Sequence, residues 1–262
     1  MTIVFELGSR MYKDFKSWNP YVGCYHRCKY CEVSFQRQAK RLRKICEKCY
    51  RYEPHFHPER LNKVPSSKNI FACSMGDIRF AKLEWIGKIL EVINKHGDKT
   101  FYLQTKAPEV FVLMLEQFKI PNNLYLGITA ETDMDTSLIS KAPKPTFRLD
   151  VFSNIDHKKK YITVEPILKF NHSTFLQWIE LCEPEIVYVG YETHGLKLLE
   201  PKLEDTLKLI EDLAEFAEVR VKNLRPAWYE NKAKANELLE NWKRKVMMID
   251  HAERGNEDGS PV

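Results

Sequence analysis

The sequence predicts an α/β protein whose parallel sheet is flanked by helices, and three observations support this fold class. Short apolar runs rich in β-branched residues alternate with longer segments of helical periodicity. Six or seven such units in 262 residues favour one open or closed barrel over two separate domains. Each apolar run also ends in polar residues, as the strands of a β/α barrel do where their loops form the active-site face.

The apolar runs are the strand candidates, and the helix candidates lie between them. Strands are expected at residues 21–22, 70–73, 100–105, 124–129, 161–165, 186–190 and 219–221. Helices are expected at 83–96, 108–118, 175–182, 203–216 and 226–248. The clearest helical pattern is that of 83–96, where Trp85, Ile89 and Ile93 fall on one face. We expect a single domain over 1–250 and a disordered tail at 251–262, which is rich in Gly, Asn, Asp, Ser and Pro.

The composition predicts a soluble protein of the cytoplasm. Hydrophobic residues make up 44% of the chain and charged residues 29%, and no run reaches the roughly 18 apolar residues of a membrane span. The first residues show neither a basic start nor a long apolar run, so no secretion signal is expected. Thiols stay reduced in the cytoplasm, so the seven cysteines are better explained as ligands or core residues than as disulfides.

The strongest local signal is the spacing C-x3-C-x2-C formed by Cys24, Cys28 and Cys31. Full protein ligation of a [4Fe–4S] cluster takes four cysteines, so three thiolates leave one iron open to a small molecule. The competing interpretation is a zinc site with His26 as fourth ligand, although a histidine between two cysteines this close together fits zinc poorly.

The motif, with an aromatic Tyr30 before its last cysteine, resembles that of the radical S-adenosylmethionine superfamily. A wider likeness, over roughly residues 11–230, is to the phage- and archaea-associated three-Cys-motif group of that superfamily. It is carried by WNPYVGC (18–24), FHPERL (56–61), FACSMGD (71–77), LQTK (103–106), LGITAE (126–131), TVEP (163–166) and VGYE (189–192).

The resemblance implies a partial (β/α)6 TIM-like barrel with a cysteine-rich basic insertion after the first strand and a C-terminal helix. It implies an enzyme whose [4Fe–4S] cluster cleaves S-adenosylmethionine to a 5′-deoxyadenosyl radical, with flavodoxin or ferredoxin as electron donor. Ser-Met-Gly-Asp stands where the superfamily keeps a Gly-Gly-Glu-like segment, which departs from its pattern. The cofactor-binding residues that it implies are Tyr30, Ser74, Met75, Gly76, Asp77, Lys106, Thr129, Glu131 and Glu165.

A second group of candidate ligands comprises Cys46, Cys49, His55 and His57. Zinc often uses a C-x2-C pair with two later histidines, but these are usually three to five residues apart. Because one residue separates His55 from His57, we expect that both do not easily reach one metal. The alternatives are an auxiliary iron–sulfur cluster completed by Cys73 or Cys182, and no metal at all.

The segment around the cysteines is strongly basic. Residues 24–63 contain eleven Lys or Arg and four Asp or Glu, a balance of +7 in a chain of net charge +5. Residues 27–63 are therefore a candidate surface for nucleic acid, with a solvated helix face as the plainer interpretation. A peptide, a protein or a small metabolite remains open as substrate. The alternative to a radical enzyme is a non-catalytic, zinc-stabilised nucleic-acid-binding protein.

Overall fold

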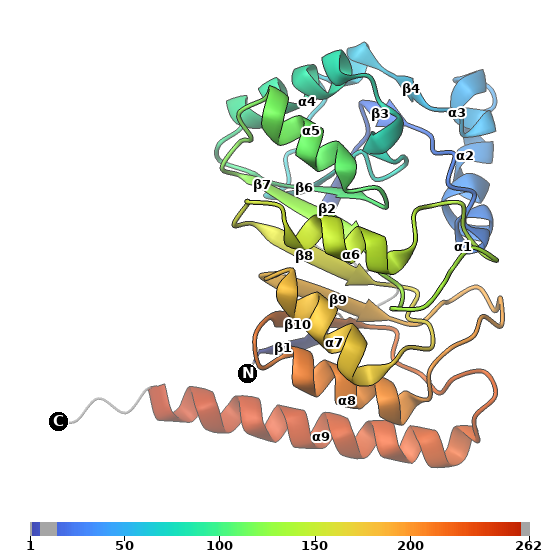
Figure 1. The fold of residues 1–262 in the computed structure, drawn as a ribbon, viewed down its shortest axis with the longest axis vertical. Helices are drawn as coiled ribbons and strands as arrows, with labels where there is room; N and C mark the ends of the chain where they lie inside the picture. Colours follow the sequence, from blue (N-terminus) through green and yellow to red (C-terminus); the bar gives the residue numbers. More distant parts are fainter. Residues whose placement is uncertain (1, 6–14, 258–262) are drawn as a thin grey trace.

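An eight-stranded sheet, all of whose neighbouring strands are parallel, forms the centre of the fold (Figure 1). The computed structural model describes residues 2–5 and 15–257, and only the backbone of 248–257. The strand order is β1-β10-β9-β8-β7-β6-β5-β2. The strands are β1 (Ile3–Phe5), β2 (Phe15–Trp18), β5 (Asn69–Ala72), β6 (Thr100–Thr105), β7 (Leu124–Thr129), β8 (Lys160–Val164), β9 (Ile186–Gly190) and β10 (Glu218–Lys222).

Helices cover one face of this curled sheet, which confirms the expected α/β half-barrel. They are α4 (Leu83–Lys95), α5 (Glu109–Gln117), α6 (Pro145–Ser153), α7 (His172–Leu181) and α8 (Leu203–Leu213), with the long α9 (Lys232–Glu257) beside α8. In α4 the buried side chains are Ile86, Ile89, Leu90 and Ile93. Burying each of them contributes about 1.5–3 kcal/mol, so the apolar periodicity fixes which face of α4 meets the sheet.

The first predicted strand does not belong to the main sheet. Tyr21–Val22 forms β3, which pairs antiparallel with β4 (His55–Phe56) in a separate two-stranded ribbon. The edges of the main sheet are instead β1 and β2, which the prediction missed. In β2 the central Lys16 and Ser17 are exposed, and such an edge strand lacks the apolar run that marks a buried one. Helix α6 was also missed, because the fully buried Arg148 interrupts its apolar pattern.

The cysteine-rich basic insertion lies at the carboxyl edge of the sheet. Figure 1 shows α1 to α3 beside the edge toward which β8 and β9 point. The insertion contains α1 (Lys29–Cys31), a π-helical turn (Glu32–Gln36), α2 (Arg37–Ala39), α3 (Glu47–Arg51) and 3-10 turns at Lys40–Leu42 and Pro58–Arg60. A further 3-10 turn, Ile78–Phe80, follows β5.

The C-terminal helix is longer than expected. The backbone of α9 reaches Glu257, inside the segment 251–262 that is expected to be a disordered tail. Residues 258–262 of that segment lie outside the described residues. Among the described helices, none has the length and apolar character needed to cross a membrane.

The opposite face of the sheet, which lines the inside of the half-barrel, has an aromatic layer. The rings of Tyr102 and Tyr125 stack with centroids 4.7 Å apart, and Tyr161 meets Tyr102 edge-on at 5.5 Å. Gly127 makes room for Tyr161, because a Cβ there would lie 2.2 Å from the ring. The inner face thus carries a layer of aromatic side chains, and Arg220 donates to the Tyr188 hydroxyl within it over 3.0 Å.

Replacing Gly127 with alanine tests this packing. Tyr161 is completely buried and cannot move aside, so we expect Gly127→Ala to lower the free energy of unfolding by about 1–3 kcal/mol. Gly97→Ala is the matched control, since its Cβ would meet nothing within 4 Å. Urea unfolding measures both variants. Equal midpoints for Gly127→Ala and wild type would contradict the close packing of Tyr161 against Gly127.

Candidate active site

The loop that carries Cys24, Cys28 and Cys31 begins directly after β3 and runs along the carboxyl edge of the sheet. Each of the three sulfurs has a polar neighbour. The backbone N–H of His26 donates to Cys24 Sγ over 3.3 Å, and the Tyr52 hydroxyl lies 3.9 Å from Cys31 Sγ. Cys28 Sγ and Ser140 Oγ are 3.0 Å apart. Donors placed around cysteine sulfurs are what iron–sulfur sites use to stabilise thiolate charge.

The environment of these thiols favours a bound cation. Burial, followed by the charge of Asp77, raises the pKa of Cys24 far above its usual range. Burial and the neighbouring Cys28 raise the pKa of Cys31 to about 11. Three thiolates in this partly buried site repel one another unless a metal centre supplies positive charge. The donor set of three cysteines therefore fits a metal cluster that has one position left for another ligand.

Backbone contacts hold this loop on two sides. Gly23 N–H donates to Met75 O over 3.0 Å, and Asp77 N–H donates to Gly23 O over 3.1 Å. Gly23 has φ of 100°, and a Cβ there would lie 2.2 Å from the backbone of Glu53. Only glycine fits this position, because the chain passes between two other segments in a left-handed conformation.

A loop after β7 holds the same motif from a third side. Lys29 N–H donates to Ile139 O over 2.9 Å, and Lys141 N–H donates to His26 O over 2.6 Å. Ser140, between these two contacts, is the residue that touches Cys28. The position of the cysteines therefore depends on a segment more than a hundred residues away in the sequence.

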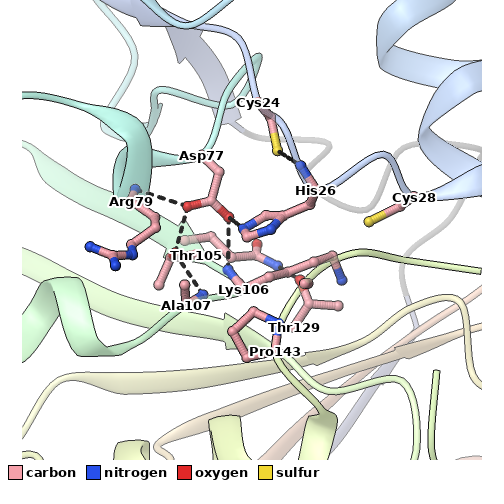
Figure 2. Close-up of polar contacts among 12 residues, drawn as sticks. Cys24, His26, Cys28, Asp77, Arg79, Thr105, Lys106, Ala107, Thr129 and Pro143 are labelled. Atoms are coloured by element: carbon pink, nitrogen blue, oxygen red, sulfur yellow. Dashed lines mark hydrogen bonds and ion pairs between the residues drawn. The ribbon is translucent and has the colours of Figure 1, made fainter. Parts of the chain in front are cut away.

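Asp77 lies at the centre of the polar contacts beside Cys24 (Figure 2). Its carboxylate accepts from the Thr105 hydroxyl over 2.6 Å and from the backbone N–H of Lys106 over 2.8 Å. It also accepts from the Arg79 N–H over 3.0 Å, and His26 Nε2 lies 3.1 Å away. Burial opposes ionisation, but these contacts hold the pKa of Asp77 below its usual range. Asp77 thus ties the cysteine loop to the end of β6.

Ser74 and Met75 are fixed by one side chain that follows β2. Asn19 Oδ1 accepts from the Ser74 hydroxyl over 3.2 Å and from Met75 N–H over 3.0 Å. Gly76 forms a backbone bridge with Gly23. A Cβ on Gly76 would approach the Gly23 backbone to 3.0 Å, so a larger residue would push the cysteine loop outward.

Glu131, whose side chain is fully buried, is the centre of a second network. Its carboxylate accepts from Lys106 Nζ over 2.6 Å, from Arg148 over 2.8 Å and from the Tyr30 hydroxyl. Burial alone would raise the pKa of Glu131, but Arg148 and Lys106 hold it well below its usual range. The ammonium group of Lys106 also lies 5.2 Å from the centre of the Tyr30 ring. The network joins the cysteine loop to β6, β7 and α6.

Thr129 and Glu165 lie farther along the same rim of polar strand ends. The Thr129 hydroxyl accepts from Gln104, and its backbone carbonyl accepts from Arg148 over 2.6 Å. Glu165 pairs with Lys222 over 2.8 Å, and burial nevertheless raises the pKa of its carboxyl. Gly190 lies between the two, since a Cβ there would contact both Glu165 and the Lys222 backbone.

The structure thus brings the predicted residues into neighbouring groups at one edge. Tyr30, Lys106 and Glu131 touch one another, and the segment from Ser74 to Asp77 contacts the cysteine loop. Glu165 belongs to a separate pair with Lys222. Sequence reasoning assigned no role to several partners: Asn19, Tyr52, Ser140, Arg148 and Lys222. Of these, only Asn19 lies within one of the quoted motifs, WNPYVGC.

One cavity lies away from this edge. Its volume is about 640 Å³, and it is lined by residues such as Lys68, Thr100 and Asn123, which lie at or just before the amino ends of the strands. Since the side chains of the candidate site lie at the carboxyl ends of the strands, this cavity is not part of that site.

The second group of candidate ligands, Cys46, Cys49, His55 and His57, comes together in the insertion. The expectation that both histidines do not easily reach one metal is therefore wrong. Side chains two residues apart in an extended segment point to the same side, so the short spacing places the two imidazoles together. Cys73 and Cys182 lie elsewhere, buried in the core between sheet and helices.

Three structures of spore photoproduct lyase have a similar fold. A cysteine-to-serine mutant superposes with a TM-score of 0.51 at 12% identity, over 84% of this chain and 81% of that chain. A tyrosine-to-phenylalanine mutant and a complex with dinucleoside spore photoproduct each give 0.50 at 11% identity, over the same shares. At this identity the likeness establishes the fold, a partial TIM-like barrel.

No curated protein matches the sequence. One family model does match, over residues 11–219, and this range includes β2, β5 to β9, the cysteine loop and the insertion. The chain therefore belongs to the family described as protein of unknown function, DUF5131.

Proposed function

We propose that this chain is a radical S-adenosylmethionine enzyme in which Cys24, Cys28 and Cys31 hold a [4Fe–4S] cluster with one open iron. The observation that carries the proposal is the position of the three cysteines at the carboxyl edge of a half-barrel, each sulfur beside a polar group. The fold shared with spore photoproduct lyase, itself a radical S-adenosylmethionine enzyme, supports it.

A cluster held by the three cysteines would supply the electron for cleavage of S-adenosylmethionine to methionine and a 5′-deoxyadenosyl radical, and this radical would take a hydrogen atom from the substrate. The chain itself holds the cysteine loop in place through the backbone contacts of Gly23, Lys29 and Lys141. Asp77 and Glu131 have their oxygens occupied by protein donors, so we assign both as positioning residues. Tyr30 has the same role through its bond to Glu131.

The remaining predicted residues are proposed to contact S-adenosylmethionine. Lys106 supplies a positive charge to the cofactor's carboxylate, and the backbone of 74–76 supplies polar groups beside the cysteine loop. Thr129 and Glu165 offer oxygens to the ribose hydroxyls from the ends of β7 and β8. A reduced flavodoxin or ferredoxin is the proposed electron donor.

Substitution of Cys28 tests the cluster assignment. After anaerobic reconstitution we expect about four irons and four sulfides per chain in the wild type, and reductive cleavage of S-adenosylmethionine to 5′-deoxyadenosine. Cys28→Ala removes one of three ligands, so iron content and cleavage should both fall to background while the circular dichroism spectrum is kept. Cys182→Ala, a buried cysteine of the core, is the matched control. If the wild-type protein produces no 5′-deoxyadenosine, the proposed enzymatic function is refuted.

Substitution of Tyr30 tests the positioning network. Tyr30→Phe leaves the buried Glu131 without one of its three donors, which should cost about 1–3 kcal/mol of unfolding free energy. Because the cysteine loop is then less well fixed, KM for S-adenosylmethionine should rise while iron content is unchanged. Tyr25→Phe is the control, since Tyr25 is 54% exposed. Equal stability and equal KM in the two variants would show that the Tyr30 hydroxyl does not help to position the cysteine loop.

Nucleic acid is the substrate class that the surface of the insertion favours. Of the eleven basic residues in 24–63 only Arg60 is partly buried, and the others are exposed. Lys40 and Arg43 flank the Tyr50 ring at 4.5 and 5.6 Å, an arrangement in which cations and an aromatic face meet a polyanion. The complex of spore photoproduct lyase with a dinucleoside spore photoproduct supports this choice of substrate class.

A salt series tests the nucleic-acid partner. Single-stranded and duplex oligonucleotides should bind with an affinity that falls steeply as salt rises, because released counterions drive such binding. The triple variant Arg37→Ala/Arg41→Ala/Lys44→Ala should bind at least tenfold more weakly, about 1.4 kcal/mol. The control removes the same charge from α9, as Lys232→Ala/Lys234→Ala/Arg244→Ala. Salt-independent or undetectable binding refutes this partner, and binding by a protein that never cleaves S-adenosylmethionine favours the non-catalytic alternative.

A further inference from the structure

The insertion contains a group of four metal-binding side chains that is separate from the three cysteines of the candidate active site. Cys46 caps the start of α3 and Cys49 lies one turn later, while His55 begins β4 and His57 follows its end. The Sγ and ring-nitrogen atoms of these four residues all lie within 4.8 Å of one another. We propose that they bind one structural Zn²⁺ ion.

The distances between the ligand atoms match a tetrahedral site. His55 Nε2 lies 3.4 Å from both Cys46 Sγ and Cys49 Sγ, and His57 Nε2 lies 3.2 Å from Cys49 Sγ. Zinc bonds of about 2.3 Å to sulfur and about 2.0 Å to nitrogen, at tetrahedral angles, place sulfur and nitrogen about 3.5 Å apart. The side chains are therefore already arranged as the corners of such a site.

Each histidine is held so that Nε2 points to the sulfurs. His55 Nδ1 lies 2.6 Å from Glu53 O, and a carbonyl oxygen only accepts, so Nδ1 must carry the proton. His57 Nδ1 lies 2.7 Å from the Glu59 carboxylate. Both imidazoles therefore present an Nε2 lone pair toward Cys49. Zinc-binding histidines are oriented by this kind of carbonyl or carboxylate partner.

Three of the four ligands are buried, as in structural zinc sites, and Cys46 is partly exposed. Cys49 is fully buried, and His55 and His57 are 7% and 8% exposed. Phe56, between the histidines, stacks on Trp85 with centroids 5.5 Å apart and an interplanar angle of 7°. The Cys49 N–H donates to Cys46 Sγ over 3.4 Å, which stabilises a thiolate at that position. Four protein ligands leave no position for substrate, so the ion has a structural role.

An auxiliary iron–sulfur cluster fits this group less well. The cluster would need Cys73 or Cys182 as a further thiolate, but both are buried in the core between the sheet and its helices. Neither belongs to the four-residue group found among the described residues. Two thiolates and two imidazoles are a donor set typical of zinc.

The proposed zinc site supports the loop that carries the first three cysteines. Tyr52 lies between the two ligand pairs, and its carbonyl accepts from Cys24 N–H over 3.3 Å. Its hydroxyl lies 3.9 Å from Cys31 Sγ, and β4 pairs with β3, which leads into Cys24. The zinc ion would therefore stabilise Tyr52 and β4, which contact the cysteine loop and the strand that leads into it. This supporting role depends on the proposed function, whereas zinc binding itself does not.

The test uses the full chain with Cys24→Ala/Cys28→Ala/Cys31→Ala, which cannot hold the proposed iron–sulfur cluster. Elemental analysis after growth with added zinc should find about one zinc per chain. Replacement by Co²⁺ should give the intense visible bands of tetrahedral cobalt bound to thiolates. Adding Cys46→Ala or His57→Gln should remove the zinc and those bands, whereas adding His96→Gln, a histidine outside the group, should remove neither.

The outcomes separate this inference from the proposed function. Absence of zinc in the triple variant, or zinc that survives both Cys46→Ala and His57→Gln, overturns the zinc site. If zinc binds but the wild type holds no iron and cleaves no S-adenosylmethionine, the zinc site stands and the proposed function fails. The supporting role predicts that Cys46→Ala alone, with its three active-site cysteines intact, retains less iron than Cys182→Ala; equal iron retention overturns that role.

Discussion

The buried carboxylate of Glu131 joins the parts of this protein that must act together. Lys106 comes from the end of β6, Arg148 from α6 and Tyr30 from the cysteine loop, and all three meet Glu131 at the end of β7. Such a charge is costly to bury, and its pairing with well-placed partners offsets rather than exceeds that cost. Its consequence is specificity of position, because removing a partner leaves part of the buried carboxylate without a hydrogen-bond donor.

The cysteine loop is fixed mainly by backbone contacts made on several sides. Gly23 lies between Glu53 and the segment that follows β5, at separations that exclude a Cβ. The loop at 139–141 closes over Cys28, and Tyr52 touches Cys24 and Cys31 from the insertion. Because these contacts come from distant segments, the arrangement of three sulfurs is a property of the whole half-barrel. An open cluster site needs this rigidity, since its ligands must leave one position free.

The fold could be predicted in large part because its information is local. The apolar runs at 100–105, 124–129 and 186–190 coincide with β6, β7 and β9, since buried parallel strands consist of continuous β-branched and aromatic residues. Edge strands lack that requirement, so the prediction misses β2, whose Lys16 and Ser17 are exposed; it also misses β1, an apolar run of only three residues. The prediction misses helix α6 because one of its buried residues, Arg148, is charged. Arg148 is buried where it pairs with Glu131, and apolar residues at helical spacing do not reveal such a pair.

The sequence by itself determined the alternation of strands and helices, the spacing of Cys24, Cys28 and Cys31, and the basic character of the insertion, because neighbouring residues along the chain carry each of these features. Only the tertiary structure decided which charges are already paired, as in Asp77 and Glu131, and that His55 and His57 face Cys46 and Cys49 together. The physical reason is that such contacts depend on the path of loops, and long-range packing sets that path rather than any periodicity in the sequence.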